Sequence, residues 1–161
     1  MAPPIVSTIN RSDIVRLATT YSDLSIVPFP PHKPVLHLLR TAGQVGTPPS
    51  PSCSPPGPVP ASFREQAENA FSNLAACLKA GGATPRDITK ITIFVVGLVP
   101  SLRGDLVEVI TAFFSPGEGE GEEGAGAHAP PSSLIGVAAL ASSEFLIEVE
   151  AEAAVAVEPE A

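Results

Sequence analysis

The chain lacks tryptophan, has one tyrosine and one methionine, and carries few charged side chains for its length. Charged residues make up 16% of the 161 positions, whereas hydrophobic residues make up 44%. So few charges are unusual for a soluble monomer, because a chain of this size leaves much of its surface in contact with water. We therefore expect part of the apolar surface to be hidden between the subunits of an oligomer.

Basic residues are also scarce. The nine Lys and Arg residues are outnumbered by 17 Asp and Glu residues, which gives a formal net charge of −8. Affinity for nucleic acids comes mostly from clustered Lys and Arg, and here the basic residues are scattered along the chain. The pattern argues against a phosphate-binding surface, and we expect no nucleic-acid partner.

Long apolar runs are absent. No stretch reaches the roughly 18 to 20 uninterrupted apolar residues that span a bilayer. The first ten residues, MAPPIVSTIN, lack the basic region and following apolar region of a signal peptide. We therefore expect no membrane partner and a soluble, cytoplasmic protein, with a mitochondrial location left open.

The few cysteines and histidines give no sign of a metal site. Two cysteines, Cys53 and Cys77, cannot make a disulfide framework. His32, His37 and His128 are too scattered in the sequence to suggest a metal site, and no carboxylate or cysteine pattern joins them. We expect no metal and no cofactor, and we interpret Cys77 as a small packing residue on a helix.

Two low-complexity segments interrupt the sequence, TPPSPSCSPPGPVP at 47–60 and SPGEGEGEEGAGAHAPP at 115–131. The first has too much proline for a helix or central strand, and the second combines glycine with mutually repelling glutamates. We interpret both as loop insertions in a single domain that spans residues 1–161. Their role stays open between surface insertions and a lid or partner-binding arm.

Two helices are predicted. The first begins near Ala61, where Ser62 and Glu65 fit a capping box, and it ends at Gly81 and Gly82. Its apolar stripe consists of Phe63, Ala67, Ala70, Phe71, Leu74 and Leu78. The second follows Pro100, and its core-facing stripe consists of Leu102, Leu106, Val109, Ile110 and Phe113.

The remaining periodic segments predict strands. They are PVLHLLRTAG at 34–43, ITKITIFVV at 88–96, LIGVAAL at 134–140 and FLIEVEAEAAVAV at 145–157, with a short edge strand expected around DIVRLA at 13–18. The last strand alternates: apolar side chains from Phe145 to Val155 share one face, and Glu148, Glu150 and Glu152 share the other. This order of elements predicts an α+β fold, with a mixed sheet and both helices on one face.

Three segments, in this order, resemble the Rid family (YjgF/YER057c/UK114), also called the endoribonuclease L-PSP family. They are TAGQVG at 41–46, FREQAENAFSNLAACLKAGGATPRDITKITIFV at 63–95, and SSLIGVAAL with FLIEVEAEA within 132–153. The resemblance extends over most of residues 35–155. It implies a chorismate-mutase-like fold and a homotrimer with small-molecule clefts between adjacent subunits.

The resemblance also implies a chemistry. Members with Rid activity hydrolyse reactive 2-imino or enamine acids to ammonia and a 2-oxo acid. An arginine there holds the substrate carboxylate in a bidentate pair, a geometry that serine cannot reproduce. Here the resemblance puts Ser132 at the position of that arginine and Ser133 at the neighbouring serine or cysteine. The carboxylate clamp is therefore missing.

Other positions follow from the same resemblance. Glu150 corresponds to the glutamate that positions the attacking water, and Gly43 and Tyr21 correspond to residues near the substrate. The asparagine often found in the second helix corresponds to Val107, and the aromatic residue near its end to Ile110. We expect Val107 and Ile110 to make the cleft less polar.

Glu150 has two interpretations. Glutamates that alternate along a strand ordinarily form a solvated face. In the resemblance this face turns toward the interior and clefts of the trimer, where Glu150 could act as a general acid or base.

Two functions therefore stay open. The first is a divergent Rid-like protein that binds and acts on a small reactive imine or enamine metabolite in intersubunit clefts. We do not expect it to deaminate 2-iminobutanoate or 2-iminopropanoate efficiently, because Ser132 replaces the arginine. The alternative is a non-catalytic metabolite-binding or regulatory trimer. A guanidinium that reached the cleft from Arg40, Arg64, Arg86 or Arg103 would favour the deaminase.

Overall fold

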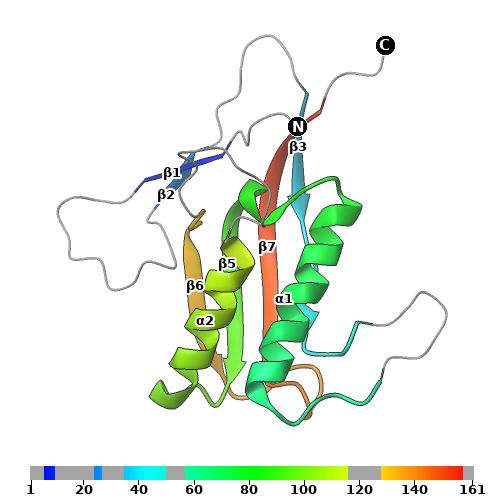
Figure 1. The fold of residues 1–161 in the computed structure, drawn as a ribbon, viewed down its shortest axis with the longest axis vertical. Coiled ribbons are helices and arrows are strands. Elements are labelled where there is room, and N and C mark those ends of the chain that lie inside the picture. The colour runs from blue at the N-terminus through cyan, green and yellow to red at the C-terminus, as the bar shows by residue number, and fades with distance from the viewer. Residues whose placement is uncertain (1–5, 10–23, 27–34, 50–56, 116–127, 158–161) are drawn as a thin grey trace.

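The computed structural model describes residues 6–9, 24–26, 35–49, 57–115 and 128–157 (Figure 1). Its strands are β1 (Ser7–Ile9), β2 (Leu24–Ile26), β3 (Val35–Arg40), β4 (Gln44–Val45), β5 (Ile88–Val96), β6 (Ser132–Val137) and β7 (Ile147–Val157). The helices are α1 (Phe63–Ala80) and α2 (Arg103–Phe114), and the 3₁₀ turns Pro85–Asp87 and Pro100–Leu102 precede β5 and α2.

A mixed sheet organises the fold. Within the described residues it has five strands in the order β3-β7-β5-β6, and β4 also pairs with β7. Strand β7 is antiparallel to β3, β4 and β5, whereas β5 and β6 are parallel. Strands β1 and β2 pair separately as a short antiparallel ribbon. The predicted α+β class with a mixed sheet is confirmed.

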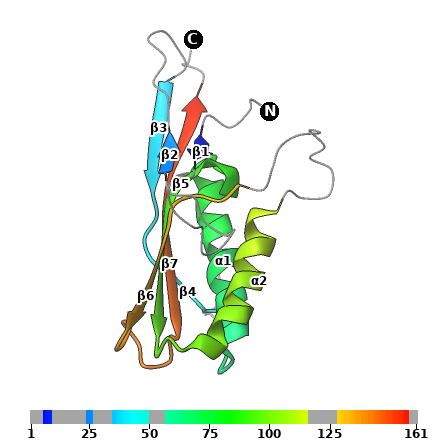
Figure 2. The same cartoon turned by 90° about the vertical axis from the view of Figure 1, so that its left-hand side faces the viewer.

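Both helices lie on one face of this sheet, as predicted (Figure 2). The arrangement follows from the alternation along β7, because Ile147, Val149 and Ala151 are buried beneath the helices. No described helix covers the opposite face, which we call the open face.

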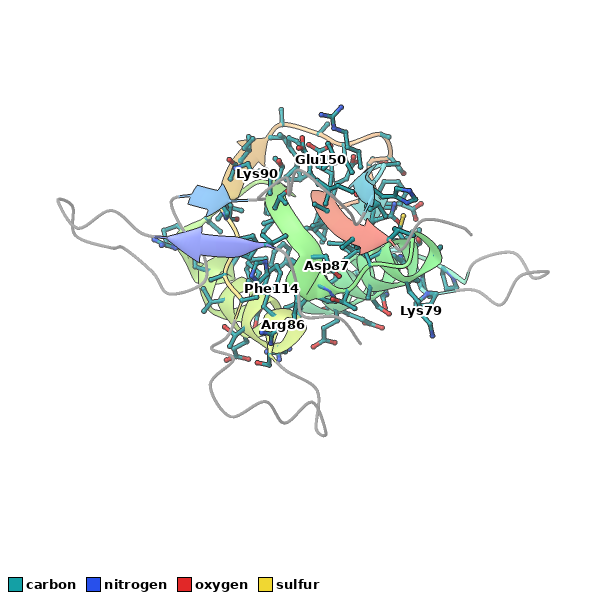
Figure 3. The ribbon with its side chains drawn as sticks, turned by 90° about the horizontal axis from the view of Figure 1, so that it is seen from above. Lys79, Arg86, Asp87, Lys90, Phe114 and Glu150 are labelled. Carbon is teal, nitrogen blue, oxygen red and sulfur yellow. The ribbon has the colours of Figure 1, made fainter. Side chains whose placement is uncertain are left out.

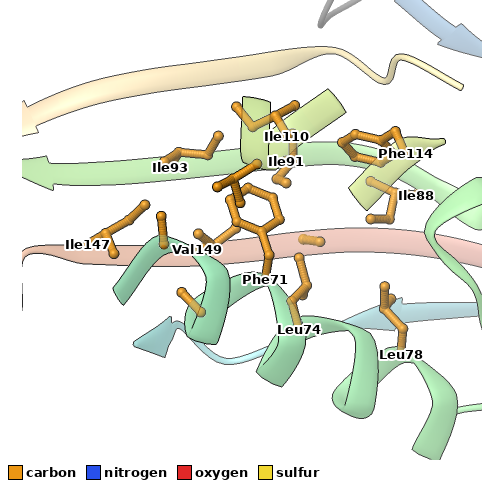
Figure 4. Packing of buried hydrophobic residues seen from close by; sticks show 14 of the residues in the cluster. Phe71, Leu74, Leu78, Ile88, Ile91, Ile93, Ile110, Phe114, Ile147 and Val149 are labelled. Carbon is orange, nitrogen blue, oxygen red and sulfur yellow. The ribbon is translucent and has the colours of Figure 1, made fainter. Parts of the chain in front are cut away.

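The core lies between the helices and the sheet (Figure 4). Phe71 and Leu74 of α1 belong to the same buried cluster as Ile91 and Ile93 of β5, and each of these side chains is at most 2% exposed. Burying one such side chain contributes about 1.5 to 3 kcal/mol, so this layer holds the helices on the sheet. Cys77 is half-buried on α1 with a free thiol.

The predicted ends of α1 are confirmed. The Glu65 N–H donates to Ser62 Oγ at 3.4 Å, which is one half of the predicted capping box. After the last turn Gly82 has a φ of 75°, a conformation that favours glycine, and the Ala83 N–H donates to the Leu78 carbonyl at 2.9 Å.

Two details differ from the sequence-based expectation. Phe114, rather than Phe113, is the buried aromatic residue of α2, while Phe113 is only partly buried. Strand β6 covers 132–137 rather than 134–140, because its partner β5 ends at Val96 and the chain turns away at Gly97, which has a φ of 61°. The expected edge strand at 13–18 lies outside the described residues.

Candidate functional site

The open face carries part of the predicted site. Glu148, Glu150 and Glu152 project from β7 away from the helices, as their alternation with buried residues predicts. Figure 3 shows Lys90 of β5 and Glu150 on this same side of the sheet, opposite Arg86 and Phe114. The fold therefore brings acidic and basic side chains together on the open face, outside the hydrophobic core between helices and sheet.

Glu150 lines a small polar hollow of about 120 Å³ on this face. The residues around this polar hollow are Arg40, Thr41, Lys90, Thr92, Glu150, Ala151 and Glu152. Glu150 is half-buried and lies opposite Thr92 in the β5–β7 register. No hydrogen bond or ion pair from the described residues reaches its carboxylate, so both oxygens can accept a bond from a ligand or water.

Two cations border the polar hollow. Arg40 Nε lies 3.8 Å from Glu152 Oε1, in a pair whose side chains are 79% and 55% exposed. Such an exposed pair contributes at most about 1 kcal/mol, so the guanidinium can reorient. Lys90 Nζ donates to Ser133 Oγ at 2.6 Å and therefore points toward β6. Positive charge thus lies on both sides of β7.

Ser132 and Ser133 begin β6, next to Ile91 and Thr92 of β5. Ser133 faces the open side, because its hydroxyl accepts the bond from Lys90. Side chains alternate along a strand, so Ser132 faces the other way. Ser133 thus shares the open face with Glu150, while Ser132 lies beside it on the edge strand.

Gly43 lies between two residues that bond to β7 on either side of Glu150. Thr41 donates its N–H to the Ala151 carbonyl at 3.0 Å and accepts the Ala151 N–H on Oγ1 at 2.9 Å, and Gln44 pairs with Val149. A Cβ at Gly43 would overlap the Glu148 carboxylate. The glycine thus permits a close approach that a larger residue would block.

Not every expected site residue joins this group. Val107 is 42% exposed on α2, in the helix layer, so within one chain it lies on the other side of the sheet from Glu150. Its place in a cleft stays a prediction. The expectation that Ile110 lines a cleft is wrong for this chain, because Ile110 is 7% exposed and packs in the core. Tyr21 lies outside the described residues.

The sequence-based reasoning missed Lys90 and Thr92. The sequence contained a signal for both residues, because they alternate with the buried residues of β5. Once β5 and β7 are paired, that alternation places Lys90 and Thr92 on the same face of the sheet as Glu150. Of the arginines considered, Arg40 reaches the polar hollow. Arg64 does not, since it bonds Glu68, Asp105 and Glu108 in the helix layer, and the hydrogen bond to Glu108 is the main cause of its raised pKa.

Histidine and other metal ligands do not gather in the described part of the chain, where no group of three or more could hold an ion. The His128 Nε2–H instead donates to the Ile88 carbonyl at 2.8 Å, and its ring meets Phe114 edge to face. Burial lowers the pKa of His128 below its ordinary value. No helix in the described ranges is long and apolar enough to cross a membrane.

Comparisons with known structures agree with this fold. A Yersinia pestis protein of unknown function from the conserved Rid family, YyfB, has a TM-score of 0.73 at 26% identity, covering 94% of this chain and 99% of that one. Escherichia coli TdcF with bound serine has a TM-score of 0.55 at 28% identity, covering 72% of this chain and 79% of TdcF. Mycobacterium tuberculosis Rv2704, of the YjgF/YER057c/UK114 family, has a TM-score of 0.54 at 22% identity, covering 93% and 99%.

A search of curated proteins found no match. The family model described as Endoribonuclease L-PSP matches residues 21–155. This match takes in β3 to β6, both helices, β7 up to Val155 and all of the polar hollow. The chain therefore belongs to the endoribonuclease L-PSP family, the group of Rid and YjgF proteins.

Proposed function

We propose that this protein binds and acts on a small reactive imine or enamine metabolite, with Glu150 directing the attacking water. The observation that carries the proposal is the half-buried Glu150 carboxylate, which has no partner among the described residues and lies in a hollow that also contains two cations. A carboxylate in this position can accept a proton from a bound water.

Hydrolysis of the imine needs a water molecule and a group that transfers protons, and Glu150 can be that group. As the water oxygen bonds to the imine carbon, Glu150 takes one water proton and passes it to the nitrogen, which receives the C=N electron pair, so that a neutral carbinolamine forms. Glu150 then takes the hydroxyl proton of the carbinolamine and passes it to the amine nitrogen. The C–N bond breaks with its electron pair on nitrogen, ammonia leaves, the C=O bond forms, and Glu150 is again a carboxylate; no redox partner is required.

The size of the hollow favours a site completed by a second subunit. Its volume of about 120 Å³ falls short of the roughly 300 to 1,000 Å³ of ligand pockets. Leu38 of β3 is 65% exposed and Ile135 of β6 is 40% exposed on the sheet, so the open face has apolar surface to bury. Proteins of this family are typically homotrimers. We propose the same assembly here, with ligand clefts between subunits.

One comparison supports the proposed ligand class. TdcF, at 28% identity, was solved with bound serine, a small amino acid. An imine derived from an amino acid is of similar size and would fit the polar hollow. Because Ser132 cannot provide a bidentate clamp, we expect slower turnover of 2-iminobutanoate than in relatives that have the arginine.

The test is a coupled assay in which an amino-acid oxidase generates the imine in the presence of the full chain. We expect Glu150→Gln to lower kcat by about 100-fold or more, the usual contribution of a general base. Glu65→Gln is the matched control, because Glu65 is exposed in the first turn of α1, and it should leave kcat unchanged.

Equal turnover in the wild type and in Glu150→Gln would overturn the role of Glu150. A wild-type protein that binds 2-oxobutanoate but turns over no imine would favour the alternative function, a non-catalytic metabolite-binding trimer.

A further inference from the structure

We infer that Lys90 provides the positive charge that receives the carboxylate of the ligand, in a chain that has Ser132 where the resemblance would put an arginine. This inference rests on the proposed function and narrows its substrate class to small 2-imino acids. It assigns a ligand-binding role to a residue of β5, the neighbouring strand.

The position of the ammonium group is the first argument. Lys90 Nζ lies 2.6 Å from Ser133 Oγ, and Ser133 directly follows Ser132 on β6. Ile91 and Thr92, the two residues after Lys90, are the parallel partners of Ser132 and Ser133. The ammonium group of Lys90, which extends from β5, therefore lies beside Ser133 of β6.

The second argument is that no nearby carboxylate among the described residues forms an ion pair with Lys90, so its charge can interact with a ligand. Glu152 is the cross-strand partner of Lys90 on β7, yet its carboxylate forms an ion pair with Arg40 of β3. Within the ranges that the structure describes, no ion pair involves Lys90. An ammonium group has three donors, and Ser133 takes one of them, so two remain for a ligand or water.

The third argument is the distance along the strand. Lys90 and Thr92 are neighbours on the open face, about 7 Å apart at the usual rise of a strand, and Thr92 lies opposite Glu150. A small 2-imino acid could therefore bring its carboxylate to Lys90 while its imine carbon lies near Glu150. In Figure 3 both labelled side chains lie on the same side of the sheet.

A lysine would recognise such a ligand differently from an arginine. The ammonium is a point charge without the planar fork that fixes a carboxylate in two bonds. The geometry thus predicts charge selectivity with little control over ligand orientation, which agrees with the slow turnover of 2-iminobutanoate proposed above.

The experiment measures the dissociation constants of 2-oxobutanoate and of its uncharged counterpart 2-oxobutanamide on the full chain. We expect Lys90→Met to weaken 2-oxobutanoate binding about tenfold or more and to leave the amide within twofold. Lys90→Arg should retain the binding of the acid. Lys79→Met is the control, because Lys79 is exposed in the last turn of α1 and both ligands should bind as before.

Unchanged binding of the acid by Lys90→Met, or equal affinity of the wild type for the acid and the amide, would overturn the inference. In either case a loss of turnover in Glu150→Gln would leave the proposed function standing. If the wild type binds neither probe and turns over no imine, both the inference and the proposed function fail. Thermal unfolding of each variant shows whether the native fold is retained.

Discussion

The two faces of the sheet are made of alternate residues of the same strands, yet they obey different constraints. On the covered face Ile147 and Val149 of β7 are fully buried under the helices. One position along, Glu148 and Glu150 are only half-buried and face the open side. Packing thus determines one face, whereas the other can vary without loss of the fold. The predictions below test how far this division holds, beginning with the largest expected effect.

Gln66 is the exception on the covered side, since it is polar and 0% exposed. Its Nε2 donates to the carbonyls of Pro60 (2.6 Å) and Glu144 (2.8 Å), and its Oε1 accepts the Leu146 N–H (2.8 Å). Gln66→Leu would leave these three backbone groups without a partner, at a cost of about 3 to 6 kcal/mol in the free energy of unfolding. Urea denaturation measures this loss. A change below about 1 kcal/mol would show that apolar packing alone supports the covered side.

Two leucines provide a matched comparison of the faces. Leu74 on α1 is fully buried, whereas Leu38 on β3 is 65% exposed. We expect Leu74→Ala to cost about 2 to 5 kcal/mol and Leu38→Ala less than about 0.5 kcal/mol in the unfolding of a single chain. If Leu38→Ala proves as costly as Leu74→Ala, sedimentation of both variants will show whether a subunit contact on the open face is the reason.

The smallest expected effect is a dependence of stability on pH. Burial lowers the pKa of His128, so the unfolded chain takes up a proton at a higher pH than the folded chain does. The contribution of His128 is thus fully present above its ordinary pKa of about 6.5 and is lost as pH falls through the lowered folded value. We expect the urea midpoint to fall between pH 7.5 and pH 5.5 by more in the wild type than in His128→Gln. If the urea midpoints of the wild type and of His128→Gln fall equally with pH, His128 is not the cause of the pH dependence.

Much of the fold could be predicted from the sequence because local signals agreed with one another. The stripe of α1, its serine cap and its glycine stop all gave the same boundaries, and the nine residues of β5 were found as a strand. The end of β6 could not be predicted, because it depends on where β5 stops pairing.

The site was only partly predictable because it, too, depends on which strands pair and in which register. Glu150 and Gly43 were identified from the resemblance, and the structure places Gly43 against Glu148, two residues before Glu150 on β7. The contribution of Lys90 depends on strand register, since its ammonium lies beside Ser133 only because β5 and β6 pair in parallel. A single sequence does not state which strands become neighbours, so this proximity becomes visible only in three dimensions.

Strand β6 is the last in the sheet order, with β5 as its neighbour on one side, and Leu134 and Ile135 on it are 41% and 40% exposed. An uncovered strand at the border of a sheet can recruit strands from other molecules. If the proposed trimer buries this strand edge in a subunit contact, the assembly would also prevent such pairing. Variants that weaken subunit association would then aggregate more readily than the wild type at the same protein concentration.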